Sequence, residues 1–492
     1  MLLDLVFANF NRILAALLLC GAYSALVIQD APTISRRGFV SLSLLFLYPF
    51  QLSPDRIEFL SFDRLEPLLP GNRFTLPGDL SGTRDQIRAA WPRWIQSHDR
   101  EIRARLVRGE EDTLVNFILF GVSFTDRPRV LPDDASETAL RLIDERTQHF
   151  IAAIAMPNSD RLNLLNNLLS RLGYRTSTEP ERQRLRQYIS SQVSRYMAER
   201  EQYRAAMNRA RADTSTSDNA ASRVYKDRGL SVDTDFRPNY ALDQALADVK
   251  RRGLLRSVKR VAIVGPGLDF TDKDSGFDYY PLQTLQPFAL IDSLVRLEMA
   301  RATDLKVSIF DISTQSLDHI SQAISRARSR QPYTLQLVLD RTPSWNSGAL
   351  NYWRRLGERI GSNVSPLTAP SQIRNVDRRA VRIPPEIVTT LAPQPLNIVT
   401  QHVEAPSSQK FDLIVATNIL LYYDRLEQAL ALLNIESMLN AGGVALFNDP
   451  VEDYAGLRLR RVATLPVPYT PDQSDEVRIC TLPTFQPQLA PA

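Results

Sequence analysis

The chain has few residues of the kinds that bind metals or form covalent cross-links. Among its 492 residues there are two cysteines and four histidines. Cys20 and Cys480 are far apart, so the sequence predicts neither a disulfide framework nor a thiolate cluster. No metal-ligand spacing links the histidines, which are His98, His149, His319 and His402. We therefore expect no metal site. A Ser/His/Asp or Cys/His nucleophile set is also missing, which argues against a hydrolase.

The chain also has little excess of charge of either sign. The formal net charge is +4 and the pI is about 9.0. Acidic and basic residues alternate along segments such as residues 99–112, a pattern typical of solvated helix faces. Only six of the 59 basic residues are lysine, a bias that indicates genome composition rather than phosphate recognition. We therefore expect no nucleic-acid partner.

Uncharged runs long enough for a membrane span are missing from the sequence, since a span needs about 20 residues. Two shorter apolar runs, residues 13–28 and 39–52, flank a Ser-Arg-Arg-Gly-Phe-Val string that resembles a bacterial twin-arginine export signal. Two interpretations stay open for residues 1–53. They are an anchor or signal that places the protein at a membrane or outside the cytoplasm, or apolar elements packed on a cytoplasmic body.

The region over residues 54–255 is predicted to be an all-helical domain. Apolar residues recur at helical spacing in five segments, residues 83–107, 114–120, 136–155, 159–172 and 179–210. Small polar residues follow at 213–221 and predict a linker, after which a helix over 241–252 leads into the next domain. Such a layer could cover a ligand site or select a substrate, or it could serve only for docking.

A strand that runs into a glycine turn is the strongest functional signal. The sequence VAIVGPGLDF covers residues 261–270, and a second strand, VSIFDI, covers 307–312. Because Gly265 and Gly267 lack a Cβ, the backbone can turn tightly and approach a ligand. Asp311 ends the second strand, where a carboxylate can accept hydrogen bonds from both ribose hydroxyls. The pair predicts an adenosine-cofactor site, and the alternative is an ordinary turn after a strand.

Strands and helices alternate through the C-terminal half. Strands are predicted at 261–264, 305–310, 335–339, 396–403, 411–417 and 444–447, with helices at 289–302, 316–329 and 425–439 and a proline-broken insert at 342–395. Two final strands, 457–465 and 476–482, flank a turn-rich segment and predict a hairpin. The fold class is therefore α/β. We expect a doubly wound, mostly parallel seven-stranded sheet with an antiparallel terminal hairpin, preceded by the all-helical domain.

Residues 251–485 resemble class I S-adenosylmethionine-dependent methyltransferases, in which a parallel sheet also ends in a hairpin. The sequences FDLIVATNILLYYD, residues 411–424, and MLNAGGVALFND, residues 438–449, are similar to chemotaxis-receptor glutamate methyltransferases. The resemblance implies that S-adenosylmethionine is the cofactor. It also implies that Gly265 and Gly267 hold the amino-acid end of the cofactor and that Asp311 binds its ribose.

The same resemblance implies roles for residues further along the chain. Adenine would border the residues that end the third strand, which are His402, Val403 and Glu404. Asn418 would face the sulfonium and the acceptor, with Tyr422 and Tyr423 lining the wall. The alternatives are purely structural roles, in which the tyrosines are core residues and Asn418 caps a helix.

A long segment, residues 271–288, separates the glycine turn from the helix that follows it. Its aromatic side chains could close over the cofactor or receive an acceptor, or they could pack against the helical domain. Asp269, just before this segment, could hold the amino group of the cofactor or take a proton. It could also cap the loop through an Asx turn.

These features together predict methyl transfer from S-adenosylmethionine to an acceptor that the sequence does not identify. Such a reaction depends mainly on holding donor and nucleophile in line. One alternative is a non-catalytic scaffold or binding protein on the same fold, because the acidic residue usual before the glycine turn is missing and Pro266 lies within the turn. A nicotinamide-dependent oxidoreductase is less favoured because of the hairpin. The predicted boundaries are 1–53 for the leader, 54–255 for the helical domain, 256–485 for the methyltransferase-like domain and 486–492 for the tail.

Overall fold

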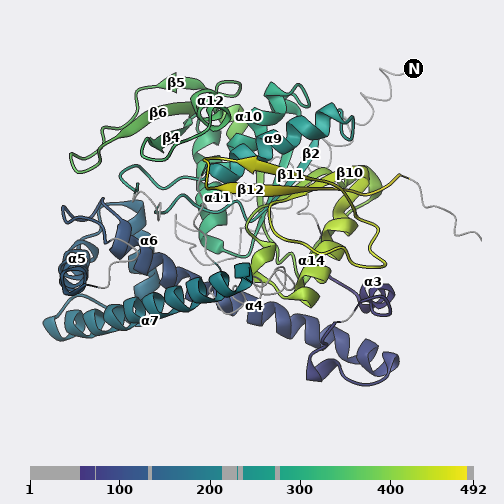
Figure 1. The fold of residues 1–492 in the computed structure, drawn as a ribbon, viewed down its shortest axis with the longest axis horizontal. Coiled ribbons are helices and arrows are strands. Elements are labelled where there is room, and N and C mark those ends of the chain that lie inside the picture. Colours follow the sequence, from purple (N-terminus) through teal and green to yellow (C-terminus); the bar gives the residue numbers. More distant parts are fainter. Residues whose placement is uncertain are drawn as a thin grey trace, which may run out of the picture. The chain divides into compact units, whose positions relative to one another are not determined.

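A seven-stranded sheet forms the centre of the C-terminal half (Figure 1). The computed structural model describes residues 56–72, 74–130, 136–212, 230, 236–271 and 277–484. The strand order is β11-β12-β10-β9-β2-β3-β7. The strands are β2 (Arg260–Val264), β3 (Lys306–Asp311), β7 (Leu391–Pro395), β9 (Phe411–Ala416), β10 (Leu439–Phe447), β11 (Arg460–Pro468) and β12 (Ser474–Thr481).

The direction of the strands matches the predicted fold class. All neighbours from β7 to β10 pair in parallel, whereas β12 pairs antiparallel with both β10 and β11. The sheet is therefore mostly parallel and ends in an antiparallel hairpin, as expected. This is the Rossmann-like architecture that the resemblance to class I methyltransferases implies.

Helices cover both faces of the sheet. Val261 and Ile263 of β2 belong to a core that includes α9 (Arg237–Arg251), α10 (Gln286–Arg296) and α11 (Thr314–Arg328). Ala262 and Val264 point to the opposite face, into a core with α14 (Arg425–Met438). Because alternate residues of β2 are buried on both sides, the strand is continuously apolar, which made it easy to recognise in the sequence.

Two strands predicted for this sheet were wrong. The one at 396–403 is not part of the sheet, because residues 396–400 are not in a strand and Gln401–Glu404 belong to a separate two-stranded sheet. The other was 335–339. Residues 335–339 lie in β4 (Tyr333–Asp340), which joins β6 (Val376–Ile383) and β5 (Ser362–Val364) in a separate antiparallel sheet. The third strand of the main sheet is β7, which ends at Pro395. Prolines at 393 and 395 argue against a strand, but β7 is an edge strand, where missing N–H donors are tolerated. Two short helices, α12 (Ser347–Arg355) and α13 (Pro385–Val388), complete this insert.

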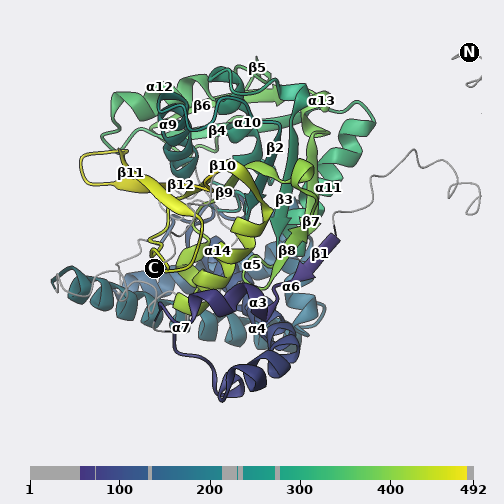
Figure 2. The ribbon, with the colours of Figure 1, turned by 90° about the vertical axis from the view of Figure 1, so that its right-hand side faces the viewer.

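The region before the sheet is helical over most of its described length. Its main helices are α4 (Arg84–Phe120), α5 (Glu137–Ala155), α6 (Asp160–Arg171) and α7 (Glu179–Ala212), after the short α3 (Phe62–Leu65). The segments predicted as two helices at 83–107 and 114–120 form the single helix α4. One strand adds to the predicted helices: β1 (Arg56–Phe59) pairs with β8 (Gln401–Glu404), as Figure 2 shows at the side of the sheet.

Helix α4 packs with different partners along its length. Trp91, Ile95 and Ile102 belong to the same core as α14 and one face of the sheet. Phe117 and Phe120, near the other end, pack with α5, α6 and α7. One helix thus contributes both to the core beneath the sheet and to the core of the helical region.

Several predicted segments lie outside the described residues. They are the apolar runs 13–28 and 39–52, the linker 213–221 and the tail 486–492. Among the residues that the structure does describe, no helix combines the length and the apolar character needed to cross a bilayer.

Candidate active site

The strand order identifies where a ligand would bind. Chain connections run in opposite directions from β2, since β3 lies on one side of it and β9 on the other. In open α/β sheets, ligands bind outside the carboxyl ends of the strands at this switch point. A pocket lies there, whose empty space is about 530 Å³ when the part open to solvent is included. Its lining comprises Leu106, Leu230, Val264, Gly265, Gly267, Phe310, Asp311, Ile312, Leu396, Ile398, Ile419, Tyr422 and Tyr423.

The glycine turn forms one end of this pocket. Gly265 and Gly267 have φ angles of 65° and 68°, in the left-handed region that favours glycine. The Gly265 N–H donates to the Phe310 carbonyl over 2.7 Å, which ties the turn to β3. A Cβ on Gly265 would overlap Ile419 Cδ1 and lie 3.0 Å from Cγ1. The Ile419 side chain therefore packs directly against the glycine.

Asp311 lies at the carboxyl end of β3 and lines the pocket, as predicted. One carboxylate oxygen accepts a hydrogen bond from the Ser313 N–H over 2.8 Å. Burial raises the pKa of Asp311 to about 6, although hydrogen bonds to the carboxylate oppose the shift. It is the only charged residue among the described residues that line the pocket.

Asp269 takes part in a different network. Its carboxylate accepts hydrogen bonds from the Tyr280 hydroxyl over 2.9 Å and from Gln283 Nε2 over 2.7 Å. The Gln283 amide also exchanges two hydrogen bonds with the backbone of Gln336 in β4, over 2.9 and 2.8 Å. Asp269 is not among the residues that line the pocket. The Asp269 carboxylate thus joins the glycine turn, through Gln283, to the antiparallel sheet formed by β4, β5 and β6.

The described part of the 271–288 segment packs against the helical region. Asp278 is buried and accepts hydrogen bonds from the backbone of Val122 and Ser123 over 2.9 and 3.1 Å. Buried Arg161 of α6 donates to the Phe270 and Tyr280 carbonyls and, over 2.8 Å, to the Asp269 carbonyl. This arrangement matches the alternative in which the segment packs on the helices.

The loop after β9 forms the opposite wall. Tyr422 and Tyr423 line the pocket, whereas Asn418 is exposed and lies outside the lining. Asn448 Oδ1 accepts from the Asn418 N–H over 2.7 Å, and Asn448 Nδ2 donates to Asn418 Oδ1 over 2.9 Å. The N-cap of α14 is Asp424, so Asn418 does not cap that helix.

His402, Val403 and Glu404 lie away from the pocket. All three belong to β8, which pairs with β1, and none lines the pocket. Their placement beside adenine rested on the strand predicted at 396–403. The third strand of the sheet is instead β7. Because that strand ends at Pro395, the residues that follow it into the pocket are Leu396 and Ile398.

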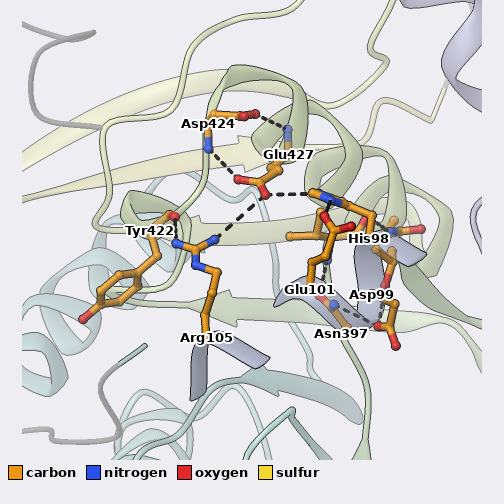
Figure 3. Close-up of polar contacts among 11 residues, drawn as sticks. His98, Asp99, Glu101, Arg105, Asn397, Tyr422, Asp424 and Glu427 are labelled. Atoms are coloured by element: carbon orange, nitrogen blue, oxygen red, sulfur yellow. Dashed lines mark hydrogen bonds and ion pairs between the residues drawn. The ribbon is translucent and has the colours of Figure 1, made fainter. Parts of the chain in front are cut away.

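Helix α4 holds two walls of the pocket through polar contacts that the sequence did not reveal (Figure 3). Asp99 Oδ1 accepts hydrogen bonds from Asn397 Nδ2 over 2.9 Å and from Thr400 Oγ1 over 2.8 Å, next to Leu396 and Ile398. Arg105 Nη2 donates to the Tyr422 carbonyl over 2.7 Å. These contacts explain how a helix from the first half of the chain closes a site at the sheet.

A buried ion pair joins α4 to the start of α14. His98 Nε2 lies 3.1 Å from Glu427 Oε1, in the group of side chains that Figure 3 draws. Burial alone would lower the pKa of His98, but the nearby carboxylates of Glu427 and Glu101 together outweigh burial, so the pKa is raised overall. Glu427 also closes a capping box with Asp424, the one part of this arrangement that the sequence spacing could have predicted.

Comparison with known proteins finds similarity in structure only. No protein-family model and no curated protein matches the chain. The N-methyltransferase NodS from Bradyrhizobium japonicum WM9 has 12% identity and a TM-score of 0.26, over 51% of this chain and 99% of NodS. The CurJ carbon methyltransferase has 13% identity and a TM-score of 0.25, over 81% and 98%. At such scores, the assignment of the fold rests on the strand order described above.

Proposed function

We propose that the chain binds S-adenosylmethionine in this pocket and transfers its methyl group to an acceptor. The observation that carries the proposal is the position of Asp311. A carboxylate ends β3 beside a glycine turn, at the switch point of the sheet, and lines an otherwise apolar pocket. A ribose diol needs such an acceptor, and a purine suits apolar walls.

The fit differs between the two ends of the pocket. Leu396, Ile398 and Phe310 provide apolar walls near Asp311, which suits the adenosine part of the cofactor. The amino-acid end would extend towards Gly265 and Gly267, where the backbone can approach closely. S-adenosylmethionine would supply a methyl group already activated on a sulfonium. The contribution expected of the protein is to position the acceptor and to exclude water.

The acceptor would approach along the wall that follows β9. Tyr422 is half-buried in this wall, and exposed Asn418 lies four residues before it. The similarity of residues 411–424 and 438–449 to chemotaxis-receptor glutamate methyltransferases favours a carboxylate as the first acceptor class to test. The roles of Asn418, Tyr422 and Tyr423 in orienting the acceptor are part of this proposal.

Calorimetric titration with S-adenosylmethionine, S-adenosylhomocysteine and NAD tests the proposal against both alternatives. We expect the two sulfur nucleosides to bind and NAD not to bind. Asp311→Ala should weaken binding by about 1–3 kcal/mol, because the ribose hydroxyls lose a buried acceptor. The exposed Asp472→Ala is the matched control and should leave affinity unchanged. If neither sulfur nucleoside binds at millimolar concentration, the scaffold alternative is favoured.

A further inference from the structure

The pocket has two chemically different ends. The end formed by Asp311, Leu396 and Ile398 combines one carboxylate with apolar walls. The other end is formed by the glycine turn and Ile419, and no charged side chain lines it within the described part of the chain. If a nucleoside places its ribose at Asp311, any substituent on the 5′ carbon extends towards Gly265. This step rests on the proposed function.

The Ile419 side chain occupies the space at that second end. A Cβ on Gly265 would overlap Ile419 Cδ1, so the Ile419 side chain fills the space on that side of the glycine, which also lines the pocket. The Ile419 side chain is half-buried and lines the pocket, which leaves it a way to rotate. Access to the glycine turn therefore depends on the rotamer of one side chain.

The backbone of Ile419 is held in place. Its N–H donates to Asp449 Oδ2 over 2.9 Å, and the Leu420 N–H donates to the same oxygen over 2.8 Å. Asp449 is buried, and the preceding residue, Asn418, is locked to Asn448 by two hydrogen bonds. The main chain cannot withdraw without breaking these bonds, so the space above Gly265 is set by the side chain at position 419.

At this end of the pocket, no acidic side chain among the described lining residues offers a ligand an attraction that would offset the steric obstacle of Ile419. Asp269 would be the natural partner for an α-amino group, but its carboxylate is held by Tyr280 and Gln283 and does not line the pocket. A methionine-bearing ligand therefore meets a steric obstacle at the glycine turn, whereas an unsubstituted nucleoside does not reach it.

We infer that Ile419 is a specificity-determining residue that discriminates among adenosine-class ligands by the size of the 5′ substituent. Adenosine enters the pocket without change in the protein. S-adenosylmethionine and S-adenosylhomocysteine enter only after the Ile419 side chain rotates away from Gly265, and the cost of that rotation lowers their affinity.

Binding of adenosine and the two sulfur nucleosides to Ile419→Ala, Ile419→Val and wild type tests this inference. Ile419→Ala should tighten binding of the sulfur nucleosides about threefold to tenfold, as expected from removing an unfavourable rotamer, and leave adenosine affinity within about twofold. Ile419→Val, which removes one methyl group, should show a smaller effect of the same sign. Leu396→Ala, at the Asp311 end of the pocket, is the matched control and should weaken the binding of all three ligands by a similar factor.

The outcomes separate the inference from the proposed function. If Ile419→Ala changes the affinities for adenosine and for the sulfur nucleosides by the same factor, or changes neither affinity, the inference is overturned while the proposed function stands. If no nucleoside binds to a folded wild-type protein, both are overturned. Thermal unfolding of each variant, with Ile419→Val as the milder change, verifies that a lost signal reflects the pocket and not misfolding.

Discussion

Replacement of Gly265 by alanine tests the geometry of the pocket without any ligand. The residue has a φ of 65°, and forcing an L-residue into the left-handed region costs about 1–2 kcal/mol. The new Cβ would also overlap Ile419 Cδ1, the end of a side chain that can rotate away, and that rotation costs about 0.5–1.5 kcal/mol. Gly265→Ala should therefore lower the free energy of unfolding by about 1.5–3.5 kcal/mol, measured by urea titration at an unchanged m-value.

Two further variants separate the backbone cost from the steric cost. Gly253 has a similar φ of 68°, but a Cβ there meets nothing within 4 Å, so Gly253→Ala measures the backbone cost alone. Ile419→Ala combined with Gly265→Ala should recover the steric part, giving a coupling free energy of about 0.5–1.5 kcal/mol in a double-mutant cycle. Additive effects of the two substitutions, or equal costs at Gly265 and Gly253, would refute the packing of Ile419 on the glycine.

Three further predictions concern stability. The raised pKa of His98 contributes stability that is present below its unfolded value of 6.5 and is lost as pH rises through the folded pKa. His98→Gln should therefore abolish a loss of stability that sets in as pH rises above 6.5 in urea titrations, and an unchanged profile would contradict the ion pair. Burial raises the pKa of Asp449 to about 7 from 3.8, so its contribution is present below pH 3.8 and is lost as pH rises towards about 7. Asp449→Asn should flatten this decline by up to about 1.4 kcal/mol per pH unit, whereas the exposed Asp472→Asn should not. Asp99→Ala leaves Asn397 and Thr400 without their buried acceptor and should lower the free energy of unfolding by about 1–3 kcal/mol in thermal or urea unfolding. A variant as stable as wild type would show that this contact is dispensable.

The sequence predicts the central part of the site because the relevant signals are local. Residues Val261–Val264, which lead to Gly265, are buried on both faces and are therefore all apolar, and the turn follows directly. Asp311 ends the next strand of the same sheet, and it is easy to place because the four residues before it are also buried. Local pattern and three-dimensional position agree wherever a strand is central and parallel.

The adenine side of the pocket could not be predicted in the same way. The strand Leu391–Pro395 contains two prolines and lies at the sheet edge, so its pattern is weaker than that of Tyr333–Asp340, which alternates cleanly but belongs to a separate sheet. The sequence therefore placed one strand of the main sheet at 335–339 and the next at 396–403, past the end of the true strand at Pro395. That error shifted the predicted adenine contacts to His402 and its neighbours.

The contribution of α4 was invisible for a different reason. Asp99 and Arg105 read as charges on a solvated helix, because their partners, Asn397 and Tyr422, lie about three hundred residues further along the chain. Side chains that pair over such separations leave no periodic signal. Only the fold shows that the helical region holds the walls of the pocket.

The crystal structure of the complex with S-adenosylhomocysteine tests the central claim most directly. The account predicts that both ribose hydroxyls lie within hydrogen-bonding distance of the Asp311 carboxylate, that adenine contacts Leu396 and Ile398, and that the Ile419 side chain has rotated away from Gly265. A complex in which the ligand binds elsewhere, with Asp311 free of contact to the ribose, would contradict it.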